Sequence, residues 1–187
     1  EGQALGIPLN FGGPYLGFLA TTKEHVRKMP GRVVGATVDT EGKRGYCLTF
    51  QTREQHIKRE RATSNICTNE ALAALAATVY MAAMGRQGLR DVAGLCLQKA
   101  AYAKQKISRI EGYSVPFSAP SFKEFVVKTP VSAKVIQERL LSEKILSGLD
   151  LGTYYPELKD HILFCVTEKR TRGEIDRLVK VLGEVRS

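Results

Sequence analysis

A densely polar segment, residues 52–69, stands directly before a long apolar stretch, and this pairing limits the fold more than any other feature of the chain. The stretch from Ala71 to Met84 carries an apolar helical pattern. Thr68 or Asn69 suits its N-cap, and Glu70 favours the positive end of the helix. Hydroxyls and amides at a helix N-terminus suit a phosphate or a carboxylate. The alternative interpretation is a capped helix behind a solvated basic loop.

Periodicity along the rest of the chain predicts a mixed α/β fold. Apolar residues at alternating steps of three and four predict a long helix from about Gln87 to Ile110, after a first helix that ends at Gly85. Thr171 and Glu174 are spaced as a capping box for a last helix. The other expected elements are strands at 15–20, 46–50, 122–128 and 162–167, helices at 22–29 and 129–146, and an exposed polar loop or hairpin at 39–45.

The composition predicts a soluble, cytoplasmic, globular chain. Its 187 residues allow one good core or two small ones, and 43% hydrophobic with 25% charged residues exclude a disordered class. No run of the sequence has membrane-spanning length, and its first residues do not resemble a signal peptide. The four cysteines lie far apart without metal-type spacing, so we expect buried free thiols at Cys47, Cys67, Cys96 and Cys165.

The positive charge is partly concentrated. The net charge is +9, and residues 23–61 hold ten Lys or Arg against five Asp or Glu. A basic face favours an anionic partner, and nucleic acid is the generic candidate. No helix-turn-helix, zinc-finger or ribonucleoprotein signature accompanies these charges. An acidic protein partner is therefore the sharper hypothesis, and a solvated surface is the alternative.

Three motifs resemble a known family. They are residues 52–68, the run from Met29 to Gly35, and residues 11–14. The resemblance runs in order through nearly the whole chain. It is to the first half of the P-protein of the glycine cleavage system, glycine dehydrogenase (decarboxylating), which in many bacteria is a separate polypeptide called subunit 1. We expect the C-terminal part of that subunit, because the first residues already resemble the interior of a fold.

This resemblance implies an α/β architecture, the C-terminal part of a fold-type I pyridoxal-phosphate-dependent transferase fold. Residues 1–85 would form the C-terminal portion of its large domain, 86–110 a long connecting helix, and 111–187 a small C-terminal α/β domain. The implied activity is that of an oxidoreductase of glycine catabolism. It decarboxylates glycine and transfers the aminomethyl group to the lipoyl group of H-protein, with pyridoxal phosphate as the electron sink.

The resemblance also places the covalent cofactor elsewhere. The lysine-bearing half of these proteins has a His-Lys-Thr-Phe motif, followed by Ile-Pro-His and then Gly-Gly-Pro. When residues 7–8 and 12–14 are aligned with it, the Schiff-base lysine position falls on Gln3. An amide nitrogen is not nucleophilic, and residues 1–22 contain no lysine. We therefore expect no catalytic residue in this chain, and pyridoxal phosphate held covalently by the lysine-bearing subunit 2 in a heterotetramer.

Several side chains are candidates for noncovalent contacts. In fold-type I dimers one partner commonly donates a loop before a helix to the other's cofactor phosphate, and Thr63, Ser64 and Asn65 occupy that place. The alternative for these three is helix capping.

Two further pairs could meet a substrate or a partner. Arg53 could grip a carboxylate with two parallel hydrogen bonds, and His56 could exchange a proton near neutral pH. Lys43 and Arg44 could steer the docking of H-protein, an acidic partner. A structural role is the alternative for each of the four. No metal site is expected.

Two other functions stay open. The chain could be a degenerate pyridoxal-phosphate fold that acts only as a scaffold for its partner subunit and contributes no contact to the chemistry. It could also be a basic nucleic-acid-binding protein, whose affinity would fall steeply with salt. Alanine substitutions of Arg53 or Ser64 in the assembled complex would separate the first of these from a contributing subunit.

Overall fold

The computed structural model describes residues 1–10, 13, 15–66 and 69–185. The chain divides into two compact units, Glu1–Gly85 and Arg86–Ser187. The boundary falls inside α2 (Ala71–Ile107), where Gly85 has φ of 61° and ψ of −179°. Glycine adopts this left-handed φ without the steric cost that a Cβ would bring. The first predicted helix therefore ends where the sequence indicated, and α2 consists of two helices joined at Gly85.

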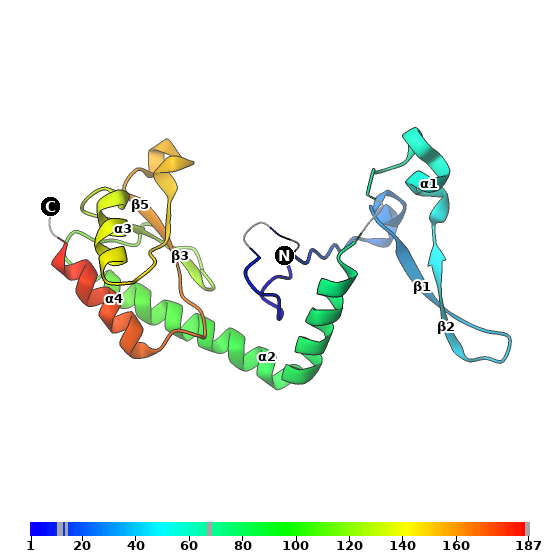
Figure 1. The fold of residues 1–187 in the computed structure, drawn as a ribbon, viewed down its shortest axis with the longest axis horizontal. Helices are drawn as coiled ribbons and strands as arrows, with labels where there is room; N and C mark the ends of the chain where they lie inside the picture. The colour runs from blue at the N-terminus through cyan, green and yellow to red at the C-terminus, as the bar shows by residue number, and fades with distance from the viewer. Residues whose placement is uncertain (11–12, 14, 67–68, 186–187) are drawn as a thin grey trace. The chain divides into compact units, whose positions relative to one another are not determined.

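The first unit contains a long β-hairpin, formed by β1 (Val33–Val38) and β2 (Arg44–Thr49) as an antiparallel pair (Figure 1). Its turn is closed by Asp39, whose Oδ1 atom accepts the backbone N–H groups of Glu41 and Lys43, both at 2.9 Å. Of the two alternatives predicted for 39–45, a loop or a hairpin, the structure has the hairpin. The shorter elements of this unit are η1 (Lys23–Lys28), η2 (Gln51–Arg53), α1 (Gln55–Lys58) and η3 (Arg59–Arg61).

Two predictions in the first unit need correction. The predicted strand at 15–20 does not form. A strand needs a neighbour for its backbone groups, and the one sheet among the described residues of this unit is the hairpin. The predicted helix at 22–29 is a short 3₁₀-helix, η1. β1 was not predicted, since Gly35 interrupts its valine-rich pattern.

The second unit is an antiparallel sheet with helices. Its strand order is β3 (Glu124–Lys128), β5 (His161–Cys165), β4 (Leu149–Asp150), and its helices are the second part of α2, α3 (Ala133–Ser142) and α4 (Arg172–Glu184). Two 3₁₀ turns, η4 (Leu151–Thr153) and η5 (Pro156–Leu158), connect β4 to β5. The helix predicted for 129–146 is shorter, because Pro130 disfavours helical backbone before it and Lys144 ends it with φ of 60°.

The hydrophobic core lies in the second unit. It joins the C-terminal part of α2, the sheet, α3 and α4, and its completely buried side chains are Ala103, Ile107, Val127, Ile136, Leu140, Ile162 and Leu182. In the described part of the first unit, Ala77 is the one hydrophobic residue counted as buried. The two units thus differ sharply in how much apolar surface they bury by themselves.

Among the three cysteines that the structure describes, the expectation of buried thiols holds for one. Cys96 is buried, whereas Cys47 and Cys165 are exposed, and all three are free. Cys47 lies on the uncovered hairpin, and Cys165 ends β5 on the face that alternates away from Phe164 and the core. Cys67 lies outside the described residues. Within the described ranges, no group of three potential ligands could hold a metal ion, and no helix is long and apolar enough to cross a membrane.

Candidate functional site

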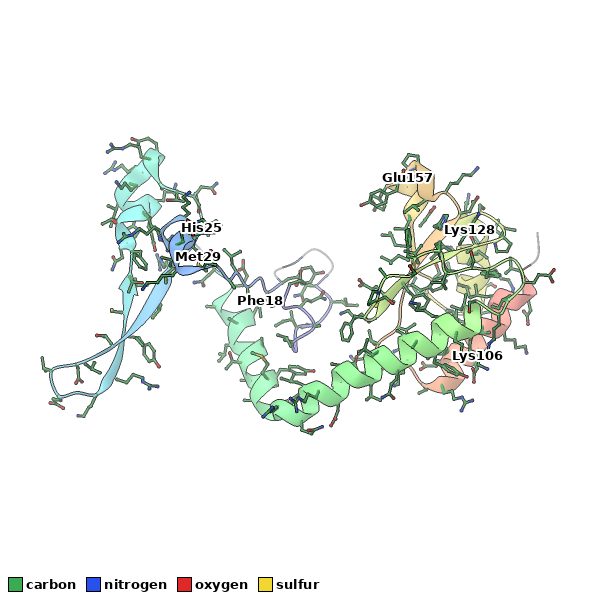
Figure 2. The ribbon with its side chains drawn as sticks, turned by 180° about the vertical axis from the view of Figure 1, so that it is seen from behind. Phe18, His25, Met29, Lys106, Lys128 and Glu157 are labelled. Carbon is green, nitrogen blue, oxygen red and sulfur yellow. The ribbon has the colours of Figure 1, made fainter. Side chains whose placement is uncertain are left out.

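Arg53 ties three segments of the polar region together. It ends η2, and its Nη1 and Nη2 atoms donate to the carbonyl oxygens of Met29 and Gly31, the latter at 2.6 Å. Met29 follows η1 directly, and Figure 2 labels it together with His25 of that helix. The N–H of Thr63 donates to the carbonyl of Arg53 at 3.4 Å. The structure therefore brings Arg53 and the start of the 63–65 segment together with the motif at 29–35.

A small pocket lies beside this anchor, around Glu54. The Glu54 side chain is only 11% exposed, and its Oε2 atom lies 3.5 Å from Nδ1 of His56 and 3.8 Å from Nε of Arg32. Together with Gln55 and Ile66, these residues line a pocket of about 230 Å³. The arrangement places a cation, an imidazole and a carboxylate at one opening.

Two buried polar atoms, one of them on the pocket residue Glu54, have spare hydrogen-bonding capacity. Among the described residues, Oε1 of Glu54 and Nε of Arg53 are buried without a partner. Buried polar atoms are rarely left unpaired in folded proteins. Each of these atoms could therefore form a hydrogen bond with a polar group of a ligand or of a partner protein.

The Nδ1 atom of His56 faces the carboxylate of Glu54. Because Nδ1 faces the carboxylate of Glu54, Nε2 is the nitrogen left for proton exchange with another group. The Arg32 side chain is 54% exposed, so it can still meet an anion from solution. Sequence reasoning missed Arg32 and Glu54 as site residues. The available signal was their position, since one lies within the motif at 29–35 and the other lies next to Arg53.

The segment proposed for phosphate contact is held by its own hydrogen bonds. Oγ of Ser64 accepts the N–H of Ile66 at 3.1 Å, and Thr63 is bound to Arg53 through its backbone. A serine hydroxyl that accepts one bond can still donate its proton to another group. Asn65 is exposed. Of the two predicted N-caps, Thr68 lies outside the described residues. The prediction for Asn69 is wrong by one residue, because α2 begins at Ala71 and the carbonyl of Glu70 accepts the N–H of Ala74.

Gln3 lies in a tight turn at the start of the chain. Its carbonyl accepts the N–H of Ile7 at 3.1 Å, and its Nε2 donates to the carbonyl of Pro8 at 3.5 Å. Gly6 in the same turn has φ of 77°, and a Cβ there would lie 2.6 Å from Cβ of Tyr80 on α2. The turn thus packs closely on α2. The residue at the expected lysine position is an amide engaged in local structure.

Lys43 and Arg44 lie at the tip of the hairpin. Nζ of Lys43 is 2.6 Å from Oε2 of Glu41, and both side chains are largely exposed. Arg44 begins β2 opposite Val38 and is also exposed. Part of the positive charge at the tip is therefore compensated by Glu41.

The fold defines a class of protein. A C-DES mutant with glycine covalently linked to its pyridoxal-phosphate cofactor matches 79% of this chain and 35% of its own length, with a TM-score of 0.52 and 13% identity. At that identity the likeness shows the fold alone. The chain has an α/β fold and forms part of the fold-type I pyridoxal-phosphate-dependent transferase fold, which confirms the predicted fold class.

The family follows from closer matches. The family model of the glycine cleavage system P-protein matches residues 1–182, and the chain belongs to this family. "Probable glycine dehydrogenase (decarboxylating) subunit 1" of Desulforamulus reducens is 62% identical over 185 residues, and that of Desulfitobacterium hafniense is 58% identical over 186 residues. These matches cover 99% and 100% of this chain, but only 42% of each relative's length.

A solved structure agrees with this assignment. The crystal structure of glycine decarboxylase (P-protein) of the glycine cleavage system, in inhibitor-bound form, matches with a TM-score of 0.87 and 39% identity. The match covers 98% of this chain and 42% of that protein. The resemblance stated from the sequence motifs is thus confirmed at the level of the family.

Proposed function

We propose that the chain acts as part of subunit 1 of a glycine dehydrogenase (decarboxylating). The assembled enzyme would release carbon dioxide from glycine and pass the aminomethyl group to the lipoyl group of H-protein. The observation that carries the proposal is the 62% identity to a subunit 1 relative across 99% of the chain. Gln3 and the absence of lysine from residues 1–22 support the assignment to the half that does not hold the cofactor covalently.

Pyridoxal phosphate, when bound, would supply the electron sink, and the partner subunit 2 would hold it. The residues of this chain fit a noncovalent role. Ser64 keeps a hydroxyl proton that can be donated to a phosphate oxygen, and Thr63 and Asn65 flank it. The guanidinium of Arg53 holds residues 29–31, and its backbone carbonyl accepts the N–H of Thr63 at the start of this segment.

The pocket around Glu54 is the proposed contact for the substrate or the carrier arm. Glu54 orients His56, so that Nε2 can accept or donate a proton at the pocket opening. Arg32 can attract a carboxylate there. Arg53 could bind a carboxylate only by releasing the carbonyls of Met29 and Gly31, which is why positioning is its proposed role. Lys43 and Arg44 remain the proposed docking contacts for the acidic H-protein.

The first test locates the covalent cofactor. The purified chain is incubated with pyridoxal phosphate and borohydride, alone and with the lysine-bearing subunit, and the intact masses and peptide maps are measured. We expect a stoichiometric adduct on the partner and none on this chain. A stoichiometric adduct at a single lysine of this chain would contradict the proposal.

The second test separates a contributing subunit from a scaffold. Ser64→Ala is compared with Ser108→Ala, which removes an exposed hydroxyl bonded only to its own helix carbonyl. In the complex with subunit 2, we expect Ser64→Ala to weaken pyridoxal-phosphate binding about tenfold and to slow carbon dioxide release, as loss of a charge-assisted hydrogen bond would do. Normal binding and turnover by both variants in intact complexes would favour the scaffold alternative.

A further inference from the structure

The first helix of α2 has an unusual composition for an exposed element. Residues 71–84 contain no charged side chain, and Thr78 and Tyr80 are the only residues with polar side-chain groups. Leu72, Leu75 and Val79 are 80%, 58% and 61% exposed. Their spacing of three and four places them along one face of the helix. A helix that is apolar all round belongs in an interior, and this one is largely uncovered.

The covered side of this helix is narrow. Ala77 is buried, and Tyr80 packs against the turn at Gly6. The hydroxyl of Thr78 donates to the carbonyl of Ala74 at 2.8 Å, so the helix backbone already provides it with a hydrogen-bond partner. A partner could therefore bury the exposed face without burying a charge, and Thr78 would keep its hydrogen bond to Ala74.

Other parts of the first unit are uncovered in the same way. On one face of the hairpin, Val34 pairs with Leu48, and these residues are 58% and 43% exposed. Phe18, whose side chain is labelled in Figure 2, is 69% exposed. A two-stranded hairpin without a covering layer is marginally stable in water. The apolar surface of this unit is thus too extensive to be explained by single exposed residues.

We propose that the stripe formed by Leu72, Leu75 and Val79 is a docking surface for the part of the subunit 1 fold that lies outside the match with this chain. The subunit 1 relatives and the solved P-protein each extend beyond the match by more than half of their length. The stripe carries no charge, so its occupant presents an apolar face, unlike an acidic carrier protein or a nucleic acid. The inference rests on family membership and not on the proposed catalytic contacts.

The test uses a defined probe. The part of the Desulforamulus reducens subunit 1 that lies outside the match is co-expressed as a separate polypeptide with the 187-residue chain, and the complex is isolated and its dissociation constant measured. Leu75→Lys is compared with Leu97→Lys, which makes the same change at a 48% exposed position further along α2. Leucine and lysine have similar helix propensities, so both variants should keep the helix.

We expect the chain to bind the probe, Leu75→Lys to weaken binding at least tenfold, and Leu97→Lys to change it less than twofold. Equal binding by the wild type and Leu75→Lys, or no binding by either, would overturn the proposal. So would a homodimer of the wild-type chain that Leu75→Lys abolishes, since a second copy would then be the occupant.

Hydrogen exchange gives an independent readout in the same samples. Amides of residues 71–84 should exchange at least tenfold more slowly in the complex than in the free chain. Equal exchange in the two states would also overturn the proposal. Neither measurement involves pyridoxal phosphate or glycine, so failure here is distinguishable from failure of the proposed enzymatic role.

Discussion

The Nη2 atom of Arg53 lies 2.6 Å from the carbonyl oxygen of Gly31, while Nη1 of the same guanidinium donates to Met29. The planar fork of arginine thus holds two carbonyls that are two residues apart. A lysine ammonium cannot reproduce this fixed geometry. A side chain whose chemistry suggested a ligand contact is therefore used as an anchor for residues 29–31, while the backbone carbonyl of Arg53 accepts the N–H of Thr63.

Replacement of Arg53 by lysine should loosen this anchor. We expect hydrogen exchange of the amides in residues 29–35 to become about tenfold faster, because a hydrogen bond to a charged group contributes about 1.5 kcal/mol or more. Arg59→Lys, at an exposed position, is the matched control. Equal protection in the wild type and Arg53→Lys would mean that the loop does not depend on the fork.

The sequence predicted the second unit well, because its signals are local. The capping box is a signal within α4, and the apolar period that includes Cys96 and Ile107 is a signal within the second part of α2. The structure contains both helices. The strand predicted at 15–20 failed for a different reason. The apolar pattern of these residues reports which side chains avoid water. A strand also requires backbone hydrogen bonds to a neighbouring strand, and the described part of this unit does not supply one.

The candidate site was only partly predictable. Arg53 and His56 were identified by residue type, but Glu54 was not, since its role depends on burial and on its distance from Arg32. Arg53 and Gly31 are 22 positions apart in the sequence, and a contact at that separation produces no periodic pattern from which it could be predicted. Whether these residues meet substrate stays a prediction.

Tyr113 should make the stability of the second unit depend on alkaline pH. It is buried, its hydroxyl donates to the carbonyl of Leu182 at 3.0 Å, and burial raises its pKa to about 12. The folded state thus keeps a proton that the unfolded chain loses near pH 10, so the free energy of unfolding falls as the pH rises from about 10 to 12.

Urea unfolding of the wild type and Tyr113→Phe, between pH 8 and 11.5, tests this dependence. At pH 8 the wild type should be more stable by about 1 kcal/mol, the value of one buried hydrogen bond. The difference should shrink above pH 10, because only the wild type carries the phenol. A difference that stays constant across this range would contradict the assignment.

Gly148 should tolerate no side chain. A Cβ at this position would lie 1.9 Å from the carbonyl oxygen of Leu163 on β5. We therefore expect Gly148→Ala to lower the free energy of unfolding by about 3 kcal/mol, the upper range for overpacking. Gly94→Ala is the matched control, since Gly94 lies within α2 with open space around it. That variant should gain about 0.5 to 1 kcal/mol. Similar effects of the two substitutions would show that β5 can shift.

The capping box of α4 gives two predictions, the first of them on substitutions of Thr171. Oγ1 of Thr171 accepts the N–H of Glu174 at 3.2 Å, and Oε2 of Glu174 accepts the N–H of Thr171 at 2.7 Å. The capping box thus fixes the N-terminus of α4, and Ile175 and Leu182 of this helix are buried in the core. Thr171→Ala should lower the free energy of unfolding by about 1 kcal/mol, whereas Thr171→Ser should change it little.

The same box predicts a dependence on acidic pH. The hydrogen bonds from the backbone and the side chain of Thr171 lower the pKa of Glu174. A lowered pKa in the folded state stabilises the fold above the unfolded pKa, and this contribution is lost as the pH falls through the folded value. Glu174→Gln lacks the titrating group, so the stability difference between it and the wild type should be present at pH 7 and should diminish below pH 4.5, the ordinary pKa of the group. Urea unfolding at a series of pH values measures it, and an unchanged difference down to pH 3 would show that the carboxylate is not held by the box in solution.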